Sequence, residues 1–561
     1  MTPLNAKFAH FGFDYTRFRF GFRTGIAACL SLVIAWALGL EHPQWSAMTV
    51  WAVSQPTRGL LLEKAAYRIL GTLIGTVVGM VLVVTAGDNI IALALGLTVW
   101  VGLCVYVGNL LHGLISYGAI LAGYSASMVA LLTRTPDALL PLGIDRLLTV
   151  FIGVITALFI GWLFTYKKAE QTLVNQFRRQ TAENLKLLAT AYQTGSLRQL
   201  NTHDRLSQLA HLEAQLIEHG TGSPAAHLSA KTIRRVLNAQ MGLFAQLEAK
   251  GIIQSKTISE HLHSCSESLV KNQTKSIRYH LKQTLKVFNH QPMTGYFKEF
   301  VEASLARLEF RDTGTTARSV RGVSVLLHRD WRGARQAAIR TIIAMTIISV
   351  IWGYTGWFQI AYLLLGASVM LTLFSTAENP AKTMYYVFLG QTAGAITALA
   401  MQALVWPYAG SILNMLVCLM PVILLSALPM SHNRTAPGAM DFNLVFLLLM
   451  QPALQYQFEP IQAITIALAV IAAPLVAMVS YRLVFPTNLR SRQQQLIVSL
   501  ERDLNELQRQ QLSGTNLTRY RARLYHRLFK LFLMADKLGV DAKVTATHYL
   551  FRVQHQVNQH E

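Results

Sequence analysis

Two basic residues stand one helical turn apart at the start of an apolar run. Lys64 and Arg68 precede Gly71, Gly75 and Gly79, and at about 100° per residue these five positions fall within roughly 80° on one face of a helix. Small residues at this spacing allow membrane helices to approach closely. We therefore expect both cations to face the interior of a helix bundle, where they can attract an anion.

Two roles fit this pair of cations. A charge inside the membrane costs about 2.5–3.5 kcal/mol on insertion scales and is usually paired or functional, which favours a site for an organic anion. The alternative is that Lys64 and Arg68 extend to the cytoplasmic interface and only set the topology. Tyr117 and Tyr124 lie one heptad apart in a later run. They can contact an aromatic ring, or else they belong to the core or the interfacial belt.

The second half of the chain contains a similar but not identical segment. Lys382 precedes Gly390 and Gly394, and Val387 stands where the first half has Arg68. Because the second cation is missing there, we do not expect the two halves to bind an anion equivalently.

A proline interrupts the second apolar run of each half. Pro56 ends that run in the first half and Pro380 in the second, and a lysine follows each. Proline frees backbone carbonyls, which are tolerated at membrane depth only beside protein or a watery cavity. Such breaks at corresponding positions of two halves point to a binding site. We therefore place the substrate path next to these two prolines.

His112 and Asp441 are the candidates for proton coupling. His112 can exchange protons near neutral pH, although a hydrogen-bonded structural role fits it as well. Asp441 opens the eleventh run, but no Asp or Glu lies in the middle of any run, where a proton-driven carrier usually has one. The proton gradient is therefore a hypothesis for the driving force. Asp145 and Arg146, at the start of the sixth run, are interpreted as an interfacial cap.

No catalytic or metal-binding motif accompanies these residues. The sequence has no Gly-x-x-x-x-Gly-Lys-Ser/Thr phosphate loop, no nucleophile elbow and no histidine or cysteine group with zinc spacing. The spacing of its cysteines does not indicate a disulfide framework either. These are Cys29, Cys104, Cys265 and Cys418. We expect no enzyme, no cofactor and no metal ion.

Composition indicates the elements that must position these residues. Of 561 residues, 52 % are hydrophobic and 14 % are charged, against about a quarter charged in soluble domains. The apolar residues gather in runs that approach the ~20 residues of a membrane helix. Twelve spans fit, at residues 23–40, 44–56, 65–86, 90–108, 111–133, 146–166, 337–355, 358–376, 383–404, 409–428, 440–456 and 461–484. The predicted fold is an all-α integral membrane protein.

The two sets of six spans begin alike, with Arg23-Thr24 and with Arg340-Thr341. Both sets start on the same side, which predicts two parallel six-helix transmembrane repeats, each followed by a helical cytoplasmic region. The expected domains are an amphipathic cytoplasmic or interfacial N-terminus at 1–22, transmembrane repeats at 23–166 and 337–485, and helical cytoplasmic regions at 167–336 and 486–561.

Most of the net charge of +22 lies outside the apolar runs. Residues 167–336 carry an excess of about +12 and residues 487–561 about +6. Basic loops mark the cytoplasmic side, so both regions and both termini are expected there. Arg134 is the clear basic residue of the outside loops, and Lys167 is one of several inside. Anionic membrane lipids are a sufficient partner for this charge, and nucleic acid is not expected.

Several segments of the first half carry a family resemblance. They are His42-Pro-Gln-Trp-Ser, Gln55-Pro-Thr-Arg-Gly59, Lys64-Ala-Ala-Tyr-Arg68 with Gly71-Thr-Leu-Ile-Gly75, and the stretch from Ser116 to Tyr124. Together with the doubled layout, they resemble the fusaric acid resistance (FUSC) family. That family includes aromatic acid exporters, such as the inner-membrane subunit of p-hydroxybenzoate efflux pumps, and is related more distantly to plant malate channels.

The resemblance implies export of organic anions, above all aromatic carboxylic acids, across the bacterial inner membrane. It also implies a periplasmic adaptor protein and a homodimer as partners, although the chain is shorter than many exporters of the family. A channel-like anion pathway is one alternative. A membrane scaffold that recruits partners through its cytoplasmic helices is another. The positions that match the family are Pro56, Lys64, Arg68, Gly71, Gly75, Pro380, Lys382, Gly390 and Gly394.

Overall fold

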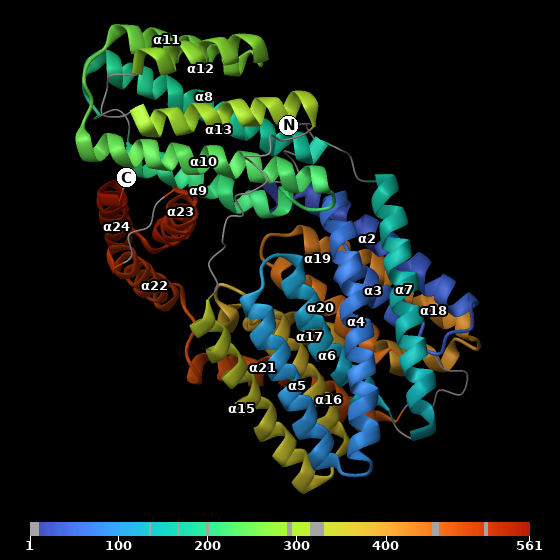
Figure 1. Ribbon diagram of the computed structural model, residues 1–561. Coiled ribbons are helices and arrows are strands. Elements are labelled where there is room, and N and C mark those ends of the chain that lie inside the picture. Colours follow the sequence, from blue (N-terminus) through green and yellow to red (C-terminus); the bar gives the residue numbers. More distant parts are fainter. Residues whose placement is uncertain are drawn as a thin grey trace. The chain divides into compact units, whose positions relative to one another are not determined.

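The computed structural model is helical, with no strand among the residues that it describes (Figure 1). These residues are 10–133, 136–164, 168–197, 201–288, 294–314, 330–450, 459–509 and 514–560. Arg134, Lys167 and the end of the predicted span at 440–456 lie outside them. The chain divides into two compact units. The apolar unit comprises Met1–Thr165 and Arg329–Asn488, and the polar unit comprises Tyr166–His328 and Leu489–Glu561.

The apolar unit contains two sets of helices. The first is α2 (Tyr15–Ala37), α3 (Gln44–Val53), α4 (Arg58–Ala86), α5 (Ile90–Leu110), α6 (Leu114–Leu132) and α7 (Leu139–Phe164). The second is α15 (Trp331–Thr355), α16 (Phe358–Leu373), α17 (Pro380–Leu404), α18 (Ile412–Leu425), α19 (Ala427–Ser431), α20 (Ala436–Leu449) and α21 (Pro460–Leu483). Among the described residues, nine helices are long and apolar enough to cross a membrane.

Three helices are shorter than the predicted spans. α3, α16 and α20 have 10, 16 and 14 described residues, which at 1.5 Å per residue gives about 15–24 Å. A bilayer core is about 30 Å thick. Within the described part of the chain, nine of the twelve predicted spans therefore correspond to helices of full membrane length, and these three correspond to shorter helices.

Three other helices begin earlier than predicted. α2, α7 and α15 start at Tyr15, Leu139 and Trp331, six to eight residues before the predicted spans. At α2 and α15 the reason is an aspartate cap, because Asp14 accepts from the backbone of Thr16 and Asp330 from that of Gly333, each at 2.8 Å. Polar residues that mark a span end in the sequence therefore lie inside these helices.

Glycines set the closest helix crossings of the apolar unit. A Cβ atom built on Gly71, Gly75 or Gly79 of α4 would lie 2.6–2.7 Å from a backbone oxygen of α6. On α17, a Cβ atom on Gly394 would lie 2.5 Å from a backbone oxygen of α20, and one on Gly390 would lie closer still. The α4–α6 and α17–α20 crossings therefore require glycine, as small-residue packing in membranes does.

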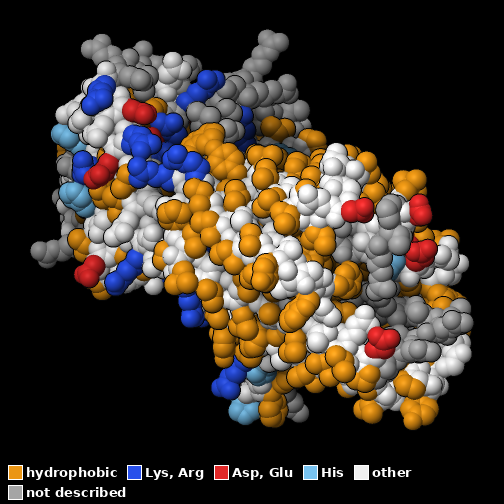
Figure 2. Space-filling model, turned by 90° about the horizontal axis from the view of Figure 1, so that it is seen from below, with side chains coloured by type: hydrophobic (Ala, Val, Ile, Leu, Met, Phe, Trp, Pro, Cys, Tyr) orange, Lys and Arg blue, Asp and Glu red, His pale blue; other side chains and the backbone are white. Residues whose placement is uncertain are grey.

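Large hydrophobic side chains are exposed on the apolar unit. On α4 they follow one face: Leu70, Leu73, Val77, Val81 and Val84. Figure 2 shows a broad area of surface covered by hydrophobic side chains with few charges among them. Exposed apolar surface of this extent indicates contact with lipid or protein rather than water.

The polar unit is a bundle of amphipathic helices. They are α8 (Lys168–Thr194), α9 (Thr202–His219), α10 (Pro224–Lys250), α11 (Lys256–Val270), α12 (Thr274–Phe288), α13 (Thr294–Thr313), α22 (Leu489–Arg509), α23 (Gly514–Leu538) and α24 (Val540–His560). Their apolar faces form one core, in which Phe244, Phe300 and Phe529 are fully buried. The helices α8–α13 and the helices α22–α24, which are far apart in the sequence, thus share a single core.

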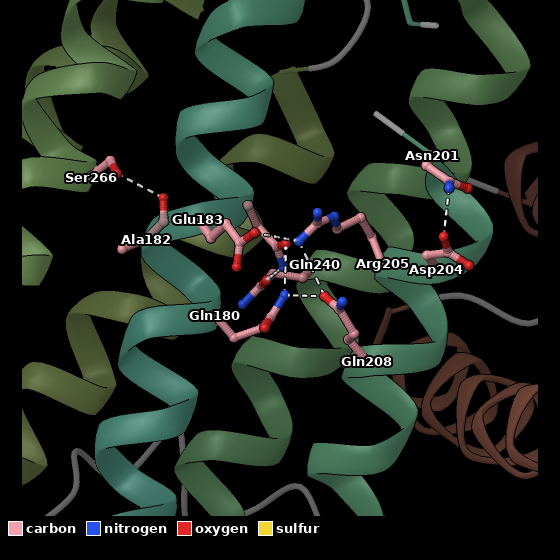
Figure 3. A network of polar contacts seen from close by, with 10 residues as sticks. Gln180, Ala182, Glu183, Asn201, Asp204, Arg205, Gln208, Gln240 and Ser266 are labelled. Atoms are coloured by element: carbon pink, nitrogen blue, oxygen red, sulfur yellow. Dashed lines mark hydrogen bonds and ion pairs between the residues drawn. The ribbon is translucent and has the colours of Figure 1, made fainter. Parts of the chain in front are cut away.

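Polar side chains also join the helices of this bundle (Figure 3). Gln240 of α10 donates to the Thr181 hydroxyl of α8 at 3.2 Å, and its side-chain oxygen accepts from Asn184 at 2.8 Å. Arg205 of α9 pairs with Glu183 of α8 at 3.0 Å. Since the amide contacts are buried, they fix the register of α8 against α10.

Candidate functional site: a cationic cavity in the apolar unit

A cavity of about 190 Å³ lies inside the apolar unit. One water molecule needs only roughly 10–15 Å³ on this measure, so the cavity has room for a larger guest. Eight helices from both sets line it, namely α3, α4, α6, α7, α16, α17, α20 and α21. Most of the lining is aliphatic, but Lys64, Arg68, Arg146 and Asp441 also line it.

Arg68 is the best-anchored cation of the cavity. It is 3 % exposed, and its Nη1 donates to the hydroxyls of Tyr117 at 3.0 Å and Tyr124 at 2.9 Å. Its buried Nε has no hydrogen-bond partner in the protein. A guanidinium carries five N–H donors, so the two tyrosines fix its position and leave donors for a further acceptor.

Lys64 and Arg146 complete the cationic side. The Lys64 ammonium lies 5.0 Å from the centre of the Tyr117 ring, and the Arg146 guanidinium lies 5.2 Å from that of Trp45. Arg146 is 2 % exposed, and its Nε and Nη1 have no hydrogen-bond partner in the protein. Aromatic faces stabilise cations, but they leave these N–H groups available to an anion.

The carboxylate of Asp441 lines the same cavity without neutralising it. Asp441 lies on α20 and is 7 % exposed. No ion pair of 4.0 Å or less joins it to Lys64, Arg68 or Arg146, all of which the structure describes. The lining therefore carries three basic side chains and one acidic side chain, which favours a negatively charged guest.

The interpretation of Asp145 and Arg146 as an interfacial cap is wrong for Arg146. Asp145 does hold the connection before α3, accepting from Glu41 N and contacting His42 Nδ1, each at 3.0 Å. Arg146 instead points into the cavity, because α7 begins at Leu139 and carries Arg146 in its second turn. The sequence did contain a signal for this inward position, because Arg146 lies on the same face of the helix as Gly153, a small residue that permits close helix packing.

Several predicted site residues do not reach the cavity. Lys382 is exposed in the first turn of α17, about 180° around the helix from the buried Gln391 that does line it. His112 lies in the connection before α6, which begins only at Leu114 because Gly113 adopts a positive φ. The structure therefore brings neither of these two residues to the substrate-path candidates.

The two prolines lie at helix boundaries rather than within helices. Pro56 is exposed in the connection between α3 and α4. Pro380 is the first residue of α17, where Asn379 caps the helix at 3.1 Å. At that position proline lacks only an N–H group that has no helical partner in any case. Both prolines thus set where a cavity-lining helix starts, and neither lines the cavity itself.

Gln391 and Tyr362 are functional candidates that sequence reasoning missed. Both are buried and line the cavity from α17 and α16. The side-chain oxygen of Gln391 has no partner in the protein. Gln391 follows Gly390 in the segment that corresponds to Gly71-Thr72 of the first half, so its position inside a conspicuous glycine motif was the available signal.

Bundled apolar helices of membrane-spanning length, around a cavity lined by Lys64, Arg68 and Arg146, indicate a multi-pass membrane protein. The sequence profile of the Fusaric acid resistance protein family matches residues 17–555. The chain belongs to that family, and the predicted resemblance is confirmed.

Curated relatives share a shorter segment. The p-hydroxybenzoic acid efflux pump subunit AaeB of Pectobacterium atrosepticum is 28 % identical over 182 residues, and that of Yersinia pestis is 29 % identical over 184 residues. Each match covers 29 % of this chain and 28 % of the relative's length. No solved structure matches. The names of these relatives describe subunits of an efflux pump.

Proposed function

We propose that this protein exports organic anions, most of all aromatic carboxylic acids, across the bacterial inner membrane. The observation that carries the proposal is the group of buried Arg68 and Arg146 and half-buried Lys64 on a mostly apolar cavity. Guanidinium groups with free N–H donors bind carboxylates strongly. The rings of Tyr117 and Tyr362 provide a surface for an aromatic body.

We further propose that the apolar unit is a parallel repeat of two six-helix bundles. The glycine crossings α4–α6 and α17–α20 support this, since they stand at corresponding places in the two sets. The cavity draws residues from both sets, as an alternating-access path requires.

The polar unit and both termini are proposed to lie in the cytoplasm. Support comes from the positive excess of residues 167–336 and 487–561, because basic segments stay on that side. Anionic lipids are the proposed partner of this charge. A periplasmic adaptor is a proposed partner by analogy with relatives that are named pump subunits. A second copy of the chain is proposed because of the family's distant relation to plant malate channels.

The proton gradient is the proposed driving force, with Asp441 as the coupling residue. Asp441 is the one acidic side chain among the described residues of the cavity lining. When charged it competes with a carboxylate substrate for the same cations, and when protonated it does not. His112 is the weaker candidate, because it does not line the cavity.

Transport in proteoliposomes tests the proposal. Vesicles that contain the purified chain and labelled p-hydroxybenzoate are compared with and without an imposed proton gradient. A carrier accumulates the acid against its concentration gradient only when protons flow. Equilibration that ignores the proton gradient would instead support the channel-like alternative, and no movement at all would support a scaffold.

A further inference from the structure

A second pocket lies within the polar unit and is apolar at its base. Five helices form it, α8, α10, α11, α12 and α13, and its volume is about 70 Å³. The base is lined by aliphatic and aromatic side chains, including Phe177, Leu281 and Phe300. It opens into a wider depression of about 660 Å³, with which it shares Val174 and three arginines.

These three arginines, Arg178, Arg307 and Arg311, stand at the rim between pocket and depression. Neither lining contains an aspartate or glutamate. Among the described residues, no carboxylate lies within 4.0 Å of any of the three. Clustered arginines are ordinarily paired, so this group lacks its usual counter-charge.

Neutral side chains hold the arginines in place. Arg307 Nη1 donates to the hydroxyls of Ser229 at 3.0 Å and Thr232 at 3.1 Å, and Arg311 Nη1 donates to Asn272 at 2.5 Å. The buried Nε of Arg178 and the buried hydroxyl of Ser304 have no partner in the protein. The pocket is thus built and positioned, but polar groups at its rim are unsatisfied.

The electrostatics agree with this geometry. Burial, reinforced by the charge of Arg311, lowers the pKa of Arg307 to about 10. Burial and the neighbouring Arg311 and Arg179 lower the pKa of Arg178 as well. Both shifts mean that the surroundings disfavour the positive charge, which a bound anion would reverse.

We propose that this pocket binds a small organic carboxylate with an apolar body. The carboxylate would accept from Arg307, Arg311 and Arg178, and the body would fill the base beside Phe177 and Phe300. An inorganic anion would leave the apolar base empty, and a neutral apolar molecule would leave the arginines unpaired. The site is separate in sequence and in lining from the cavity of the apolar unit, so it does not depend on the transport path.

Hydrogen–deuterium exchange of the full-length protein in detergent tests this site, with benzoate as the probe. Inorganic phosphate supplies charge without an apolar body, and benzyl alcohol supplies the body without charge. Benzoate is expected to slow exchange in α8 and α13, whereas the other two are not at the same concentration. The half-saturating benzoate concentration is expected to rise about tenfold in Arg307→Gln, as loss of a charge-assisted hydrogen bond predicts.

Three further variants complete the test. Arg311→Gln is expected to behave like Arg307→Gln and decides the matter if Arg307→Gln misfolds, because Arg311 is exposed. Arg502→Gln is the matched control, since Arg502 is exposed on α22 and lines neither the pocket nor the wider depression. Arg68→Gln should leave the benzoate protection of α8 and α13 unchanged, because Arg68 lines the cavity of the apolar unit and not this pocket. Absent protection, protection undiminished in both Arg307→Gln and Arg311→Gln, or equal protection by phosphate would overturn the proposal.

Discussion

At the scale of single residues, the account depends on how arginines are held without being neutralised. Two tyrosine hydroxyls position Arg68, and a tryptophan face positions Arg146. These neutral partners satisfy part of each guanidinium and leave its charge intact. Such an arrangement suits an anion that must bind and leave again, whereas an ion pair would have to be broken in every cycle.

Arg146→Gln is predicted to lower p-hydroxybenzoate transport about tenfold, because one charge-assisted hydrogen bond is worth roughly 1.5–3 kcal/mol. The measurement is initial efflux from cells at equal membrane abundance of wild type and variant. Arg434→Gln serves as the control, since Arg434 is exposed and lines no part of the cavity. If both variants transport alike, Arg146 has no part in the path.

Asp441→Asn is predicted to separate transport from the proton gradient. The uncharged amide should still permit movement down the substrate gradient, because the three cations are retained. Accumulation driven by an imposed pH difference should be lost, which proteoliposomes with an internal pH dye can measure. If Asp441→Asn still accumulates the acid under an imposed pH difference, Asp441 is not the residue that couples transport to protons.

At the scale of helices, glycine contacts decide which elements meet. A Cβ atom at Gly75 would lie 2.6 Å from the Ala122 oxygen and 2.7 Å from the Ser125 Cβ. Gly75→Ala is therefore predicted to destabilise the apolar unit by about 1–3 kcal/mol, the usual cost of overpacking. Gly295→Ala on α13 is the matched control, because nothing lies within 4 Å of its added Cβ. The measurement is thermal unfolding of both variants in detergent. Equal stability of Gly75→Ala and Gly295→Ala would contradict the close α4–α6 crossing.

A buried ionic group joins α9, α10 and α23 of the polar unit. Glu213 contacts Arg234 Nε at 2.9 Å and His526 Nδ1 at 3.4 Å. Burial would raise the pKa of Glu213, but His526 and Arg234 together hold it at about 2. A lowered pKa stabilises the fold above the ordinary value of 4.5, and this stabilisation is lost as the pH falls from there toward 2.

Glu213→Gln is accordingly predicted to destabilise the polar unit near neutral pH by roughly 3–5 kcal/mol, because it leaves the Arg234 guanidinium without its carboxylate partner. Below about pH 3 the difference from wild type should shrink. Exchange protection of α9 and α23 as a function of pH measures this. A difference that stays constant between pH 7 and pH 3 would contradict the assignment.

At the scale of the whole molecule, periodicity and composition predicted the helical fold, and the resemblance carried by segments such as Lys64–Arg68 indicated the family. The spacing of Lys64, Arg68 and the glycines also placed two of the three cations on the α4 face that lines the cavity. The inferences about the helices and about these cations need only the spacing of residues within one helix, because that spacing determines which side chains share a face.

The rest depended on where helices begin and on contacts between distant segments. Arg146 was misread because a charge was taken to end a span, while α7 starts seven residues earlier. Lys382 was expected to mirror Lys64, but α17 starts at Pro380 and turns that side chain outward. Asp441 and Arg68 line the same cavity although they are 373 positions apart in the sequence. No pattern within a single helix could have predicted that they share it.

The central claim is that the cations of the cavity, above all the buried Arg68, bind the transported anion. Proteoliposome transport of p-hydroxybenzoate by Arg68→Gln, with Arg434→Gln as the control, tests it most directly. We predict that Arg68→Gln transports at one tenth of the wild-type rate or less, and that the control matches wild type. Wild-type transport by Arg68→Gln in the same membranes would contradict the account.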